Sequence, residues 1–182
     1  MTPPAINMSS STTTTTLKNN AAFRMSLGDI TPNNVGQLKR LNVVLFPVAY
    51  APSFYKEILE VGEFAKIIYF NDVCVGGVCC RKETVAGSAT QNLYIATLGV
   101  LAPYRRLGLG SKLLNHILET ATEASTTPKV SKIYLHVQFG NEEALEFYKK
   151  HGFEVVEKCE NYYPQFEVKD AYKLEKVLVA SN

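Results

Sequence analysis

One short run of arginine and glycine residues has the composition of a phosphate-binding loop. Residues 105 to 110 read RRLGLG, after a β-rich stretch that ends at Leu101 and directly before a stretch with helical periodicity. At such a turn the backbone amides and the positive end of the helix dipole form an anion site, and glycine lets a phosphate approach the backbone. The pattern is neither GxGxxG nor GxxxxGKS/T, which disfavours dinucleotide and nucleoside triphosphate loops. Taken alone, it also fits an ordinary glycine-rich turn with two solvated arginines.

The three histidines of the chain do not indicate a metal site. His116 and His151 have no second ligand at helical i, i+4 spacing, and no cysteine and histidine spacing matches a zinc site. His136 lies in a β-rich stretch, where a lone histidine favours a structural role in the core. We therefore expect chemistry that needs no metal ion.

Length and composition exclude several classes of protein. The chain has 182 residues and a formal charge of only +2, so we expect one domain and no nucleic-acid partner. No apolar run approaches the roughly 18 residues of a membrane span. The four cysteines include the adjacent Cys79 and Cys80 and show no CxxC spacing, which favours buried thiols over a disulfide framework. These features predict an intracellular protein. We expect it in the cytoplasm, with the nucleus as an additional location.

The first 26 residues differ from the rest of the chain. Ser9 to Thr16 is an unbroken run of hydroxyl residues, and no acidic residue precedes Asp29. Such a segment has too little apolar surface to offset its ordering entropy, so we expect a disordered tail over residues 1–26. An organelle transit peptide is the alternative, but only Lys18 and Arg24 are basic and such peptides are usually rich in arginine.

The remaining chain, residues 27–180, alternates between helical and strand-like periodicity. Thr31 followed by Pro32 is typical of a helix start, and Pro47 ends that helix near Phe46. Asn71 and Asp72, between β-rich runs at 65–70 and 73–81, predict a hairpin with a tight turn. The other predicted strands are 92–101, 132–137, 153–157 and 171–179, and the other predicted helices are 53–59, 109–122 and 141–150. This mixture predicts an α/β or α+β fold, with helices on both faces of a sheet.

Two motifs in this order resemble the GCN5-related N-acetyltransferases. RxxGxG begins at Arg105, and NxxAxxFYxxxGF begins at Asn141. Four further segments look like the catalytic subunits of NatE-type N-terminal acetyltransferases. They are FPV at Phe46, YIATLGVLAPYRR at Tyr94, YLHV at Tyr134 and NYY at Asn161. The resemblance covers about Leu27 to Leu178 and implies the GNAT fold, with a mixed, mostly antiparallel central sheet.

The resemblance implies an acetyl-CoA-dependent transfer to the N-terminal amine of proteins that start with Met and an apolar residue. In this family a strand binds the pantetheine arm, the loop binds the pyrophosphate, and the second motif reaches the arm and the thioester. The matching positions are Leu98, Gly99, Val100, Arg105, Arg106, Leu107, Gly108, Leu109, Gly110, Ser111, Asn141 and Tyr148.

The family positions that match the catalytic groups are Tyr94, His136 and Tyr148. Family mechanisms relay the proton of the amine through an ordered water. His136 is the better base on its ordinary pKa, and Tyr94 is expected to orient the water. Tyr148 is expected to donate a proton to the departing thiolate. The alternative for each of the three is a structural role in the core.

The acceptor pocket implied by the resemblance lies between two aromatic segments. Its residues are Phe46, Pro47, Val48, Tyr50, Tyr94, Tyr162, Tyr163 and Phe166. Apolar side chains with a few phenols suit a methionine side chain. The chain departs from the family at Pro164, Gln165 and Phe166, where relatives have basic residues and then an aliphatic one. The preference for the second substrate residue therefore does not carry over.

Two other functions stay open at this stage. A lysine or small-amine acetyltransferase is one, although the loop from Phe46 to Pro52 holds no carboxylate for a polyamine; Glu157, Glu160 and Glu167 flank the tyrosines. A non-catalytic acyl-CoA-binding subunit of a ribosome-associated acetyltransferase complex is the other. The expected partners are nascent or mature protein N-termini and a NatA-like scaffold subunit at the ribosome.

Overall fold

The computed structural model describes residues 23–178 of the chain. Its first strand, β1 (Met25–Asp29), begins two residues before the expected start of the folded part. Backbone pairing of Met25 with Phe70 on the neighbouring strand incorporates this end into the sheet. The rest of the predicted tail, and residues 179–180 of the predicted domain, lie outside the described residues.

In the part of the chain that the structure describes, seven strands form one sheet in the order β1-β2-β3-β4-β5-β7-β6. Of their six pairings only β4–β5 is parallel, which confirms the expected mixed, mostly antiparallel sheet. The strands after β1 are β2 (Ala65–Phe70), β3 (Val73–Thr84), β4 (Thr90–Val100), β5 (Lys129–Gln138), β6 (Glu154–Cys159) and β7 (Ala171–Val177).

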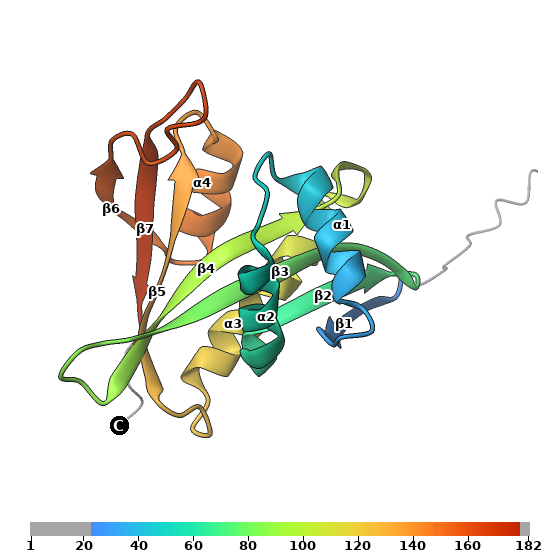
Figure 1. Ribbon diagram of the computed structural model, residues 1–182, viewed down its shortest axis with the longest axis horizontal. Coiled ribbons are helices and arrows are strands. Elements are labelled where there is room, and N and C mark those ends of the chain that lie inside the picture. Colours follow the sequence, from blue (N-terminus) through green and yellow to red (C-terminus); the bar gives the residue numbers. More distant parts are fainter. Residues whose placement is uncertain (1–22, 179–182) are drawn as a thin grey trace, which may run out of the picture.

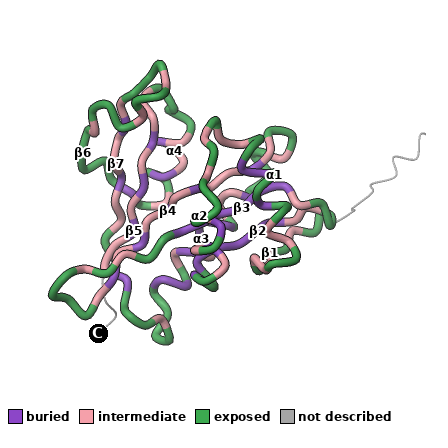
Figure 2. The backbone as a smooth tube through the Cα atoms, in the orientation of Figure 1, coloured by how far each residue is buried: buried purple, intermediate pink, exposed green. Residues whose placement is uncertain are grey.

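Helices cover both faces of the sheet, as predicted. In Figure 1, α1 (Val35–Leu45) and α2 (Pro52–Glu60) lie in front of it, and α3 (Leu109–Thr122) lies behind it. The fourth helix, α4 (Glu142–Lys150), lies next to the start of α3. Two short 3-10 helices, η1 (Gly62–Phe64) and η2 (Ala102–Tyr104), complete the set within residues 23–178. Figure 2 shows that the buried residues concentrate along the central strands and on α3.

The predicted start of the first helix is wrong by three to four residues. Thr31 and Pro32 form a turn, and α1 begins at Val35. The carbonyl of Thr31 accepts from the amides of Asn34 (3.1 Å) and Val35 (2.9 Å), while Asn34 Oδ1 accepts from the amide of Thr31 (2.8 Å). Asn34 therefore stabilises a turn that precedes the helix, and the hydroxyl of Thr31 caps nothing among the described residues.

The sheet opens at its centre. Pairing between β4 and β5 runs only from Thr90 with Lys129 to Tyr94 with Tyr134. Beyond that point β4 pairs only with β3, and β5 pairs only with β7. Figure 1 shows the two strands diverging from this junction. The divergence leaves one edge of β4 without a backbone partner from the sheet, which is the feature that creates the site.

A close approach of two glycines keeps β3 against the end of β4. A Cβ added at Gly76 would lie 2.5 Å from the carbonyl oxygen of Gly99 and 3.1 Å from the Cα of Val100. Because backbone atoms cannot yield as a flexible side chain does, we expect Gly76→Ala to lower the free energy of unfolding by about 1–3 kcal/mol. Urea denaturation measures the change.

Gly36→Ala is the matched control for this prediction. Gly36 lies in α1, and an added Cβ there would meet nothing within 4 Å. Alanine should raise the free energy of unfolding by about 0.5–1 kcal/mol, because glycine is costly inside a helix. Equal stabilities of the two variants would contradict the steric argument.

Candidate active site

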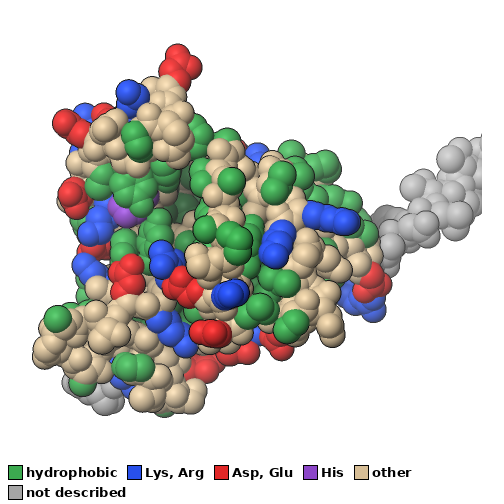
Figure 3. Space-filling model, in the orientation of Figure 1, with side chains coloured by type: hydrophobic (Ala, Val, Ile, Leu, Met, Phe, Trp, Pro, Cys, Tyr) green, Lys and Arg blue, Asp and Glu red, His purple; other side chains and the backbone are tan. Residues whose placement is uncertain are grey.

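A cleft of about 680 Å³ lies between the diverging halves of β4 and β5. Its walls come from the loop after α1, the second half of β4, the start of α3, the end of β5, one face of α4 and the β6–β7 loop. Figure 3 shows the surface hollowed between the part that carries β6 and β7 and the part that carries α1, with hydrophobic side chains on both sides. One continuous cleft thus runs from the predicted anion loop to the predicted acceptor pocket.

The predicted anion loop has the expected geometry at one end of the cleft. Gly108 has φ +83° immediately before α3, and an added Cβ would meet no protein atom within 4 Å. The first turn of α3 holds no acidic residue, so its positive end is available to an anion. Arg105 Nε donates to the carbonyl of Val100 (3.0 Å), and Arg106 pairs with Glu143 (3.0 Å).

Six of the seven predicted loop residues line the cleft. They are Arg105, Arg106, Gly108, Leu109, Gly110 and Ser111. Leu107 does not line it and is 41% exposed. The side chain of Leu109 is buried in the core, so only the backbone of this residue is available to a ligand.

The predicted strand segment Leu98, Gly99 and Val100 forms one wall. Its edge toward β5 has no partner in the sheet, so its backbone groups can pair with an extended ligand. Gly99 also lets the end of α1 approach, because an added Cβ would lie 3.0 Å from the side chains of Leu45 and Phe46. The strand therefore joins the cofactor end of the cleft to the acceptor end.

Helix α4 supplies the opposite wall. Asn141 caps the helix, since its Oδ1 accepts from the amide of Ala144 (3.2 Å), and its amide nitrogen stays available to a ligand. Tyr148 is only 8% exposed and lines the cleft, and burial raises the pKa of its phenol well above the ordinary value. This phenol stays protonated at neutral pH and can donate a hydrogen bond.

Three predicted residues from separate segments meet beside the middle of the cleft, and one of them reaches its wall. The Tyr162 ring stacks on the His136 ring at a centroid distance of 4.0 Å, and the hydroxyls of Tyr162 and Tyr94 lie 3.2 Å apart. The Tyr94 and His136 rings are 5.8 Å apart, edge to face. Only His136 of these three lines the cleft, so Tyr94 and Tyr162 lie beside it and not on the wall.

The surroundings of His136 favour its neutral form. Its Nδ1 is buried and has no hydrogen-bond partner within residues 23–178. Burial, and then the charge of Lys173, lower the pKa of His136 below its ordinary value. Burial and the hydrogen bond to Tyr162 raise the pKa of Tyr94. At neutral pH the imidazole can accept a proton, whereas the Tyr94 phenol remains protonated.

The acceptor pocket has two aromatic walls. Phe46, Pro47, Val48 and Tyr50 line the cleft from the loop after α1, and Tyr163 and Phe166 line it from the β6–β7 loop. Tyr50 is fixed by a stacked contact with Phe54 at 4.7 Å. Burial raises the pKa values of Tyr50 and Tyr163 to about 12, so both phenols are uncharged hydrogen-bonding groups.

Sequence reasoning missed several residues at this site. Ala144 and Phe147 on α4, and His151 directly after it, line the cleft with Tyr148, and their i, i+3 and i+4 spacing was a usable signal. Tyr134 lies beside Tyr94 (5.0 Å between centroids) and donates to Glu83 Oε2 (2.6 Å). Period-two alternation places Tyr134 on the same side of β5 as His136, but no sequence signal indicates Glu83.

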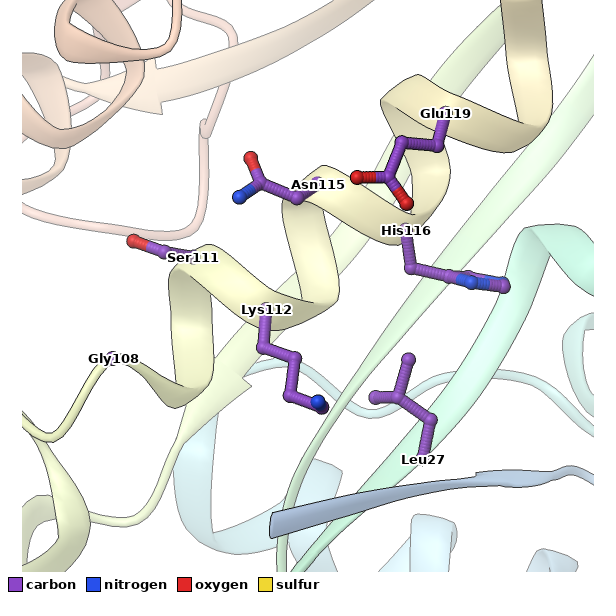
Figure 4. Close-up of a pocket in the computed structure, with 7 residues that line it drawn as sticks. All are labelled: Leu27, Gly108, Ser111, Lys112, Asn115, His116 and Glu119. Carbon is purple, nitrogen blue, oxygen red and sulfur yellow. The ribbon is translucent and has the colours of Figure 1, made fainter. Parts of the chain in front are cut away.

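A second hollow, of about 410 Å³, lies along α3 next to the anion loop. Figure 4 shows Lys112 extending toward Leu27, while Ser111 and Asn115 point to another side of the helix. His116 Nε2 lies 3.0 Å from the carbonyl oxygen of Glu63. These polar groups do not converge on one point, so the hollow does not form a second reaction centre.

The match to a protein-family model decides the class of protein. Residues 37–153 match the acetyltransferase (GNAT) family. The chain belongs to the GNAT family of acetyltransferases. The matched residues include the anion loop, His136 and the whole of α4, so the family motifs and the cleft coincide.

Two relatives and one solved structure are similar to this chain over most of its length. N-alpha-acetyltransferase 50 of Danio rerio is 54% identical over 155 residues, which cover 85% of this chain and 89% of the relative. The probable N-acetyltransferase san of Drosophila melanogaster is 49% identical, covering 85% of this chain and 81% of the relative. The structure of Arabidopsis thaliana Naa50 with the bisubstrate analogue CoA-Ac-MVNAL superimposes with a TM-score of 0.78 at 47% identity, covering 85% of this chain and 99% of that one.

Two further properties hold for residues 23–178 of this GNAT protein. None of the helices there is both long and apolar enough to span a bilayer. In the same residues, no group of three or more His, Cys, Asp or Glu side chains could hold a metal ion.

Proposed function

We propose that this GNAT protein transfers the acetyl group of acetyl-CoA to the α-amine of proteins that begin with Met followed by an apolar residue. One observation carries the proposal: a single cleft joins the anion loop to the aromatic pocket, and His136 lines this cleft between the two. The Naa50 of Arabidopsis thaliana is described with an analogue that links CoA to the peptide MVNAL, which supports the same pairing of ligands here.

The chemistry requires little from the protein beyond orientation and one proton acceptor. An α-amine has a pKa near 8, so about a tenth is neutral at pH 7. The amine nitrogen bonds to the thioester carbonyl carbon, the carbon–sulfur bond breaks, and the amine proton passes to His136 directly or through a water. Tyr94, held by Tyr162, orients that water. Tyr148 donates a hydrogen bond to the departing sulfur.

The acceptor end suits an unbranched apolar side chain. Phe46, Val48 and Phe166 offer apolar surface, and Tyr50 and Tyr163 add phenols that can bond to the peptide backbone.

Acetyl transfer to two peptides tests the proposal. One begins with Met-Leu, and the other has a blocked N-terminus and an internal lysine. We expect rapid turnover of the first peptide only, because a lysine amine with a pKa near 10.4 is less than a thousandth neutral at pH 7. Mass spectrometry of the products identifies the acetylated nitrogen.

The other outcomes of this experiment have distinct meanings. Activity confined to the blocked peptide would make the protein a lysine acetyltransferase and leave the aromatic pocket unexplained. Inertness toward both peptides, with acetyl-CoA still bound, would make it a non-catalytic acyl-CoA-binding subunit.

We also propose a cellular context for this protein. The resemblance to NatE-type subunits supports association with a NatA-like scaffold at the ribosome, and with it a location in the cytoplasm and the nucleus. Purification of the full chain from its own cells, followed by identification of bound subunits, tests the association.

A further inference from the structure

A stripe of charged residues lies on the same side of the sheet as His136, and the proposed reaction does not use it. Lys173 on β7 is the cross-strand partner of His136 on β5, and Glu157 on β6 is the cross-strand partner of Lys173. Paired residues of adjacent strands point to the same side of a sheet. The histidine therefore has an ammonium group as its neighbour and a carboxylate one strand further away.

Several contacts fix the position of the Lys173 ammonium group. Its Nζ lies 3.0 Å from Glu175 Oε1 and 5.2 Å from the centroid of the Tyr134 ring. Glu157 Oε2 lies at 3.9 Å, a looser contact. The Lys173 side chain is only 24% exposed, and such a shielded charge is screened less by solvent than a surface charge. Since Glu175 also binds Lys132 (2.9 Å), its charge is shared between two lysines.

The aromatic rings around His136 all belong to tyrosines. Tyr94 on β4, Tyr134 on β5 and Tyr162 on the β6–β7 loop surround the ring at centroid distances of 5.8, 6.1 and 4.0 Å. Glu83 on β3 contacts the hydroxyl of Tyr134 and not the imidazole. In the sheet register Lys173 lies directly opposite His136, and Glu157 lies one strand further away. Glu175 is the diagonal neighbour on the strand of Lys173, and its carboxylate is paired with both Lys173 and Lys132.

We propose that Lys173 is a positioning residue that keeps His136 uncharged, and therefore able to accept the amine proton, under mildly acidic conditions. The inference rests on the proposed function, in which His136 is the proton acceptor. A like charge beside an imidazole makes its protonation less favourable. Glu157 acts in the opposite direction, and its greater exposure makes its effect smaller.

The charge-removing variant Lys173→Met tests the proposal. The pKa of His136 should rise, so a larger fraction of the histidine is protonated at about pH 6. We expect kcat/KM relative to the native protein to fall about two- to fivefold at about pH 6 and to stay near unity at about pH 8.5. Ionisation of the substrate amine is common to both proteins and cancels in the ratio.

Three variants act as controls. Lys173→Arg keeps the charge and should keep the native pH profile. Glu157→Gln removes the opposing charge and should shift the acidic limb of the profile toward lower pH. Lys158→Met removes a positive charge from β6, the strand next to that of Lys173. Lys158 pairs with Tyr172, so its side chain points to the other face of the sheet from Lys173. The pH profile of this variant should therefore match that of the native protein.

Histidine NMR titration gives a readout that does not depend on activity. The chain has three histidines, so the resonance of His136 can be assigned by substitution. We expect the midpoint to move to higher pH in Lys173→Met and to lower pH in Glu157→Gln. An unchanged His136 titration, or a loss of activity equal at all pH values, would overturn the proposal. Inactivity of the native protein with a shifted titration would instead overturn only the proposed function.

Discussion

His136→Ala is expected to lower kcat/KM for the Met-Leu peptide by about 10²- to 10⁴-fold, the range typical of losing a general base. The imidazole is the proton acceptor that lines the middle of the cleft, and the pKa of the neighbouring Tyr94 is raised too far for that phenol to replace it. Affinity for acetyl-CoA should change little, because the anion loop is a separate part of the cleft. Steady-state kinetics and calorimetric titration measure the two quantities.

His116→Ala is the matched control for this substitution. His116 lies on α3, contacts the carbonyl oxygen of Glu63 and does not line the cleft. The variant His116→Ala should therefore have the same kcat/KM as the native protein. If kcat/KM of His136→Ala fell by less than tenfold, His136 would not be the general base, and bulk water would be the proton acceptor.

Gly110→Asp is expected to weaken the binding of CoA by about 10²-fold, because it places a carboxylate where the pyrophosphate is proposed to lie. Gly110 is helical, and an added Cβ would meet only the Phe147 ring, at an ordinary contact distance of 3.6 Å. The first turn of α3 has no acidic residue, so the new carboxylate also interacts favourably with the helix dipole. The free energy of unfolding should therefore stay the same or rise by about 0.5–1 kcal/mol.

This opposition between stability and binding makes the experiment decisive. Gly110→Ala adds the same Cβ without the charge, so it should be at least as stable as the native protein and lose much less affinity for CoA. Calorimetric titration with CoA and thermal unfolding of both variants supply the data. If Gly110→Asp bound CoA as well as Gly110→Ala does, the start of α3 would not be the anion site.

Local signals in the sequence determined many of the elements. The predicted helix at 109–122 matches α3 (Leu109–Thr122), because a glycine at positive φ precedes it and apolar residues recur with helical period. Asn71 and Asp72 adopt φ values of +46° and +68°, which are the left-handed conformations of a tight hairpin turn. These features depend on residues within a few positions of each other. The start of α1 was misplaced because Asn34, and not Thr31, makes the hydrogen bond that stabilises the preceding turn.

The family motifs determined most of the cleft as well. His136, Tyr148, Asn141 and most of the anion loop line one cavity, as the resemblance implied. Leu107 lies outside it, and Tyr94 and Tyr162 support His136 from the side. A linear motif specifies which residues recur, but it does not specify which side chain of a loop or strand faces the ligand.

Only the tertiary structure decided how these segments meet. The separation of β4 from β5 after Tyr94 and Tyr134 creates the cleft, and no residue type at that point predicts the separation from the sequence. The cross-strand pairing of His136 with Lys173 joins residues 37 positions apart through the register of two antiparallel strands. Register between distant strands is set by the packing of the whole sheet, since a slip of one residue would reverse every side chain. The sequence by itself therefore determined the elements and the chemical groups, and the pairing of the strands determined which of those groups act on one another.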